Sequence, residues 1–82
     1  MKLPKRIRLR DRKLGREGAM GLSTPPDLIE IDPAQASRDR LDTVIHEALH
    51  LLLPNATEQY IRAYSQRLSD VLWRDRWRRV EF

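Results

Sequence analysis

The sequence predicts an α+β fold, in which a small sheet of two or three strands is followed by two antiparallel helices. Two short segments in the first half alternate apolar and polar side chains, which is the period of a half-buried strand. Two longer segments in the second half repeat apolar side chains every three or four residues, as amphipathic helices do. The 82 residues form one domain, 1–82, with a small core, because so short a chain buries only about 60% of the surface that its unfolded form exposes.

The first strand is expected near the N-terminus, where Leu3, Ile7 and Leu9 alternate with lysines and arginines. This spacing predicts that one face packs on the core and that the other is strongly basic. The second strand is expected over Leu28 to Asp32. It should lie near an edge of the sheet, because Pro33 follows it and cannot donate a ladder hydrogen bond.

Residues 12–26 separate the two strands and contain three glycines and two prolines. This composition predicts a long loop, with a short extended piece around Met20 to Ser23.

The first helix is predicted over Arg38 to Leu52, with Ser37 as its N-cap. The second begins at Glu58 behind the capping residue Thr57, and the short connection makes the two helices antiparallel neighbours. The stripe expected on the inner face of the second helix consists of Tyr60, Ile61, Tyr64, Leu68, Val71 and Leu72.

The amino-acid composition argues against a disulfide-stabilised protein and against a membrane-spanning one. Without cysteine the chain has no disulfides and no thiolate ligands, so a metal held by His and carboxylate, or an oligomer, is left to support the small core. No segment approaches the roughly 18 apolar residues of a membrane span, and no apolar region follows the basic N-terminus as in a secretory signal. We therefore expect a cytoplasmic protein that uses no membrane.

The net charge of +4 is uneven: residues 1–16 carry eight Lys or Arg against one acid, and residues 17–72 carry four against nine. Basic ends of this kind can attract nucleic acid, although a charged strand is more often a solvated face.

The segment His46-Glu47-Ala48-Leu49-His50 has the residue types and spacing of a metal site. Histidines four residues apart on a helix lie on one face, so both imidazoles can bind one ion. Glu47 lies on an adjacent face, where its carboxylate can take a proton from water at the metal and pass it to a leaving amine. These are the only two histidines of the chain, which favours a zinc site over a chance pattern.

A catalytic zinc needs a third protein ligand, which here must be a carboxylate. Of Glu58, Asp70, Asp75 and Glu81, the first is preferred, because helical geometry places it at the edge of the apolar stripe and Asp70 nearly opposite. The alternative for Glu58 is a first-turn acid that pairs with Arg62.

Three further features are candidates for supporting roles. Asp42, one turn before His46, can accept a hydrogen bond from a histidine N–H, and Tyr64 can stabilise an oxyanion. The strand Leu28 to Asp32 can pair with an extended peptide and align its scissile bond.

The pattern His46-Glu47-Ala48-Leu49-His50 followed by Glu58 at the start of a helix resembles the zincin metallopeptidases, and in particular the gluzincins. The layout over residues 27–73 is similar to minimal members of that group and to short phage or prophage proteins. The resemblance implies a minimal zincin-like domain, zinc ligands at His46, His50 and Glu58, Glu47 as general base and acid, and a peptide or protein substrate. Longer gluzincins carry the third ligand further along the chain, in a fuller motif.

Two other functions remain open. One is a binding module, in which zinc only stabilises the scaffold and Arg6, Arg8, Arg10 and the Trp73/Trp77 tail contact nucleic acid or an acidic partner. The other is an autoinhibited peptidase, in which the Gly-rich loop or the C-terminal tail occupies the open position of the metal.

Overall fold

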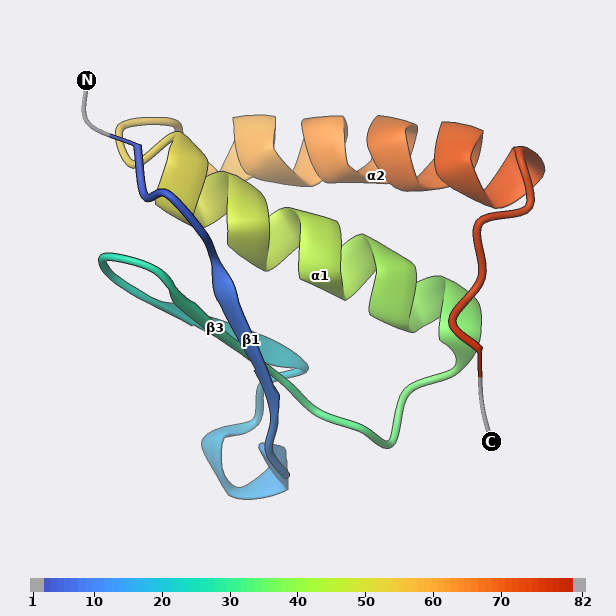
Figure 1. The fold of residues 1–82 in the computed structure, drawn as a ribbon, viewed down its shortest axis with the longest axis horizontal. Coiled ribbons are helices and arrows are strands. Elements are labelled where there is room, and N and C mark those ends of the chain that lie inside the picture. The colour runs from blue at the N-terminus through green and yellow to red at the C-terminus, as the bar shows by residue number, and fades with distance from the viewer. Residues whose placement is uncertain (1–2, 81–82) are drawn as a thin grey trace.

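The computed structural model describes residues 3–80, which form a three-stranded sheet and two long helices. In chain order the elements are β1 (Arg8–Asp11), the short 3-10 helix η1 (Gly15–Glu17), β2 (Gly21–Thr24), β3 (Leu28–Ile31), α1 (Ser37–Leu52) and α2 (Glu58–Arg74). Helix α1 lies between the sheet and α2 and packs on β2 and β3, and its Arg40 side chain reaches Asp11 of β1 (Figure 1). The predicted α+β arrangement is confirmed.

The sheet has the strand order β1-β3-β2, with β1 parallel and β2 antiparallel to β3. The extended piece expected around Met20 to Ser23 is β2. The prediction that the Leu28 to Asp32 strand lies near an edge is wrong, because β3 is the central strand. Ile31 is the last paired residue of β3, and Pro33 comes after it, beyond Asp32. The missing N–H of Pro33 therefore removes no hydrogen bond from either ladder.

The prediction of a half-buried first strand is also wrong. The strand β1 begins at Arg8, all four of its residues are exposed, and Leu9 keeps 54% of its surface. The reason is that α1 covers the other two strands and leaves β1 as an uncovered edge.

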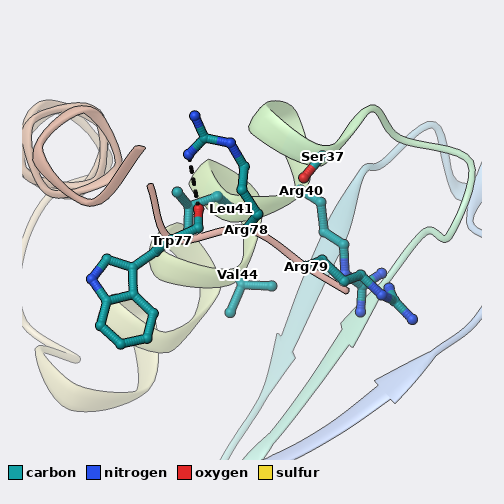
Figure 2. Close-up of a pocket in the computed structure, with 7 residues that line it drawn as sticks. All are labelled: Ser37, Arg40, Leu41, Val44, Trp77, Arg78 and Arg79. Carbon is teal, nitrogen blue, oxygen red and sulfur yellow. Dashed lines mark hydrogen bonds between the residues drawn. The ribbon is translucent and has the colours of Figure 1, made fainter. Parts of the chain in front are cut away.

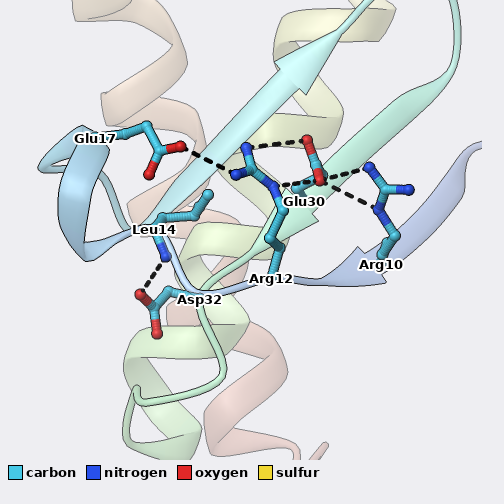
Figure 3. A network of polar contacts seen from close by, with 6 residues as sticks. All are labelled: Arg10, Arg12, Leu14, Glu17, Glu30 and Asp32. Carbon is cyan, nitrogen blue, oxygen red and sulfur yellow. Dashed lines mark hydrogen bonds and ion pairs between the residues drawn. The ribbon is translucent and has the colours of Figure 1, made fainter.

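The basic face of β1 is real, but intramolecular carboxylates pair with it (Figure 3). Glu30, only 6% exposed on the neighbouring strand, accepts hydrogen bonds from Arg12 Nε at 2.7 Å and from Arg10 Nη2 at 2.8 Å. These bonds, that from Arg12 first, hold the pKa of Glu30 below its usual value. Two fixed positive charges thus make it favourable to bury this carboxylate in ionised form.

The loop between β1 and β2 contributes to the core, although its composition gives no sign of this. Leu14 is fully buried with Ile29, Ile31 and Ile61. Its N–H donates to Asp32 Oδ2 at 2.9 Å, which pins the loop to the end of β3. Backbone N–H groups, that of Ala34 first and that of Leu14 second, lower the pKa of Asp32.

The predicted N-cap is wrong for α1 and confirmed for α2. Helix α1 starts a residue earlier than predicted, so Ala36 is its N-cap and Ser37 lies inside the first turn without capping it. Helix α2 begins as predicted, because Thr57 Oγ1 accepts a hydrogen bond from the N–H of Tyr60 at 3.2 Å.

The apolar stripe predicted for the inner face of α2 lies mostly on its outer, exposed face. The buried positions are Ile61, Ser65 and Ser69, whereas the exposed apolar side chains are Tyr60, Tyr64, Leu68 and Val71. The Oγ atoms of these two serines lie 3.1 Å from the carbonyl oxygens of Arg62 and Gln66 in the same helix, so small polar side chains with acceptors close by face α1. Among the helices and strands of residues 3–80, α1 alone packs on α2, so the centre of the apolar stripe of α2 remains exposed there.

Within residues 3–80, neither helix is long and apolar enough to cross a membrane.

Candidate metal centre

Three donor atoms converge between α1 and α2. His46 and His50 lie one turn apart on α1, and their Nε2 atoms are 3.2 Å from each other. Glu58, the first residue of α2, places Oε1 2.9 Å from His46 Nε2 and Oε2 2.8 Å from His50 Nε2. One ligand atom from each of the three residues lies within 4.8 Å of the others, so the group could hold a metal ion.

The spacing of these atoms fits a tetrahedral ion. Ligand bonds of about 2.0–2.1 Å at tetrahedral angles put donor atoms about 3.3 Å apart. The separation of 3.2 Å between the imidazole nitrogens agrees with this value, whereas the two Glu58 contacts, one from each carboxylate oxygen, are shorter. Two imidazoles and one carboxylate also leave a fourth position free, as catalytic zinc sites do.

The start of α2 places Glu58 at this centre. The Thr57 cap fixes the first turn of the helix directly after the short connection from α1. Arg62, the alternative partner, lies 3.9 Å from Glu58, farther than either histidine. The histidines are therefore the main partners of this carboxylate.

Glu47 points from α1 toward β2 rather than toward α2. Its Oε1 accepts a hydrogen bond of 2.7 Å from Ser23 Oγ, which also lies 2.7 Å from the Glu47 carbonyl oxygen. Gly21 permits this approach, because a Cβ there would come within 2.9 Å of Glu47 Cγ and 2.7 Å of Thr43 Cγ2. Strand β2 thus holds Glu47 beside the histidines, in a place that the sequence did not predict.

A polar pocket of about 440 Å³ brings these groups to one opening. His46, Glu47, Glu58 and Arg62 line it, together with the Gly-rich segment 18–21, Asp42 and Thr43. The loop forms a wall of the pocket, whereas the described tail residues 77–79 line a different one. Within residues 3–80, His46, His50 and Glu58 are the group of His and carboxylate side chains that could hold a metal ion.

Serines supply the supporting contacts between the helices. Ser65 Oγ lies 3.5 Å from His46 Nδ1, which is a long contact. Asp42, expected to accept from a histidine, accepts instead from Ser69 Oγ at 3.2 Å. Serine at these two positions looked like ordinary helix surface in the sequence.

The remaining candidates lie apart from the three ligands. Tyr64, expected on the inner face, is 47% exposed and stacks loosely with Tyr60, and it does not line the polar pocket. Asp70 pairs with Arg74 and Arg38, and Asp75 accepts from the Trp77 indole. Glu81 lies outside the described residues.

A second, apolar pocket of about 500 Å³ adjoins the centre. His50 forms part of its wall, and the other lining residues are Leu3, Pro4, Pro25, Pro26, Leu51 and Pro54. A molecule bound at the histidines would therefore meet a polar wall on one side and an apolar one on the other.

The cations proposed for nucleic-acid contact are partly engaged within the chain. Arg8 donates to Asp27 at 2.9 Å, and Arg10 pairs with Glu30. Trp73 lies under the guanidinium of Arg78, 3.3 Å from the ring centroid. Ion pairing lowers the positive potential that β1 would offer to a phosphate backbone.

No family model matches the chain, and no curated protein or solved structure is significantly similar to it. The resemblance to the gluzincins therefore depends on the sequence motif alone.

Proposed function

We propose that this protein is a zinc-dependent hydrolase that cleaves a peptide or a related amide. The observation that carries the proposal is the convergence of His46, His50 and Glu58, with a second carboxylate, Glu47, held apart from them by a serine. A purely structural metal needs no such carboxylate in the pocket beside its ligands.

A zinc ion bound there would polarise the scissile carbonyl and lower the pKa of water at its open position to about 7. Glu47 accepts the proton of the attacking water and delivers it to the leaving amine. Ser23 keeps the Glu47 carboxylate in position through its hydrogen bond to Oε1. Arg62, a cation in the wall of the polar pocket, is better placed than Tyr64 to stabilise the developing oxyanion.

The substrate is proposed to bind in an extended form. Strand β2, not the central β3, offers a sheet edge to a peptide, and its Ser23 contacts Glu47. The apolar pocket beside His50 has room for an apolar side chain of the substrate.

The test is a Glu47→Gln variant of the zinc-loaded protein, assayed on a mixture of fluorogenic peptides. The amide keeps the shape of the side chain and cannot take the proton, so we expect the zinc content to stay and kcat to fall about 10²- to 10⁴-fold. Glu17→Gln, which alters an exposed glutamate on η1, is the matched control and should keep full activity. A Glu47→Gln protein as active as the wild type would end this proposal.

A further inference from the structure

A third pocket lies on a different face of α1 from the metal centre. It has a volume of about 260 Å³ and lies between the first half of the helix and the tail segment 77–79. At 100° per residue, Leu41 and Val44 are about 140° and 160° around the helix from His46. The pocket is therefore separate from the site of the proposed hydrolysis.

The end of α2 carries the tail to this place. Arg76 has a left-handed φ of 68°, and its N–H donates to the Trp73 carbonyl while the N–H of Trp77 donates to that of Leu72. This pair of bonds ends a helix in a fixed direction, here back across α1. Arg78 then lies over the Trp73 ring, at 3.3 Å from its centroid, and donates to the carbonyls of Trp73 and Trp77.

One end of the pocket has an excess of positive charge. Arg40, 9% exposed, donates through Nη2 to Asp11 Oδ1 at 2.7 Å. Arg79 reaches the other oxygen of the same carboxylate over 3.4 Å, so two guanidiniums share one anion.

Within residues 3–80, the Nη1 group of Arg40 is buried and has no hydrogen-bond partner. A buried donor without an acceptor is unfavourable, because it has lost its hydrogen bonds to water and gained none in the protein. A second acceptor at this end of the pocket would relieve that cost.

The rest of the pocket is apolar. Leu41, Val44 and the exposed Trp77 supply its walls, together with the alkyl parts of the arginines. In Figure 2 the side chains of Leu41, Val44 and Trp77 surround the space, and those of Arg40 and Arg79 extend to one end of it. The shape therefore suits a ligand with an apolar body and a single anionic end.

We propose that this pocket binds a small organic carboxylate, with its apolar body between α1 and Trp77 and its carboxylate on Arg40 and Arg79. The carboxylate takes over Arg79, whose contact with Asp11 is the longer of the two, and a turn of the Arg40 side chain that exposes the buried Nη1 gives it a second donor. Arg79 is 44% exposed, so its side chain has room to turn toward the ligand. The proposal goes beyond the hydrolase and does not depend on it.

Titration of the full-length, zinc-loaded protein with octanoate, followed by amide NMR spectra, tests the proposal. We expect saturable binding with shifts at residues 37–44 and 77–79, and at least tenfold weaker binding of the neutral octanamide. N-acetyl-leucyl-phenylalanine and its carboxamide form a second pair, and the tighter of the two acids shows whether the site prefers a free acid or a chain-end carboxylate. Equal affinity for acid and amide, shifts confined to His50 and its apolar pocket, or no saturation would overturn the proposal.

Variants separate the carboxylate contact from general charge. Arg79→Gln should weaken octanoate binding at least tenfold, and Arg16→Gln, which removes an exposed arginine of η1, should leave it unchanged. Arg40→Gln removes a buried partner of Asp11 and can impair folding, so Trp77→Ala provides the independent test of the apolar wall. If Arg79→Gln and Arg16→Gln behave alike, the pocket has no specific carboxylate site.

Discussion

Glu30 and Glu58 are each held between two basic side chains, but the two clusters have different chemistry. Glu30, on the outer face of the sheet, accepts from Arg10 and Arg12 (Figure 3). Glu58, between the helices, lies 2.8–2.9 Å from the Nε2 atoms of His46 and His50. A guanidinium keeps its protons and has no lone pair to offer, whereas a neutral imidazole has one.

The comparison shows why the type of base decides the role of a carboxylate. Two arginines complete the bonding of Glu30, which is almost fully buried and ties β1 to β3. Two histidines leave Glu58 half exposed, at the mouth of a polar pocket, where an ion can replace the direct contacts. One cluster is therefore a structural tie and the other a candidate metal centre.

The largest effect is expected when a ligand is removed from the centre. His50→Ala should reduce the zinc content from about one ion per chain to near none. At free zinc about 100-fold above the Kd, the wild type gains about 2.7 kcal/mol, a shift of roughly 10–20 °C for a domain of this size, which the variant should lose. Metal analysis and thermal melts with and without zinc measure both. If the wild-type protein bound no zinc and gained no stability from it, the cluster around Glu58 would be a structural tie like the cluster around Glu30.

Glu58→Gln changes the carboxylate of the centre alone. It should weaken zinc binding by at least tenfold, because the amide lacks the negative charge, while circular dichroism shows unchanged helix content. Asp70→Asn, an acid on the same helix that pairs with Arg74 and Arg38, is the control and should bind zinc like the wild type. Unchanged zinc affinity in Glu58→Gln would move the third ligand elsewhere.

Ser23→Ala tests the contact that separates Glu47 from the ligands. A hydrogen bond of about 0.5–1.5 kcal/mol that orients the base corresponds to a two- to tenfold loss of kcat. Zinc content should not change, because Ser23 does not contact the histidines. Ser23→Thr keeps the hydroxyl and should recover part of the rate. Equal kcat in Ser23→Ala and wild type would show that Glu47 needs no such support.

The smallest effect is expected from pH, and it belongs to the arginine cluster. Hydrogen bonds from Arg12 and Arg10 lower the pKa of Glu30 in the folded state from its usual 4.5. As the pH falls below about 4.5, the unfolded chain takes up this proton first, so the stabilisation is present above that pH and is lost below it. Urea unfolding of wild type and Glu30→Gln between pH 6 and 3 should show a shallower acid decline in the variant. Parallel curves would mean that other carboxylates, such as Asp32, cause the decline.

Local patterns in the sequence were sufficient to predict the two helices and the pair of histidines on the first of them. The spacing of His46 and His50, the Thr57 cap and the place of Glu58 at the start of α2 are consequences of helical geometry, which acts over a few residues. The alternation in residues 28–31 likewise predicted a strand, and a sheet of two or three strands followed by two helices was the expected arrangement, of which the structure has the three-stranded form.

Only the tertiary structure decided what each face of those elements meets. The sequence could not show that α1 covers β3 and leaves β1 open, or that serines rather than tyrosines of α2 face α1. It also gave no sign that Ser23, 24 residues before Glu47, holds its carboxylate, or that Leu14 in a glycine-rich loop is buried. Periodicity shows which side chains share a face, but contacts between distant segments set which face is buried, and those contacts form only when the sheet and helices pack together.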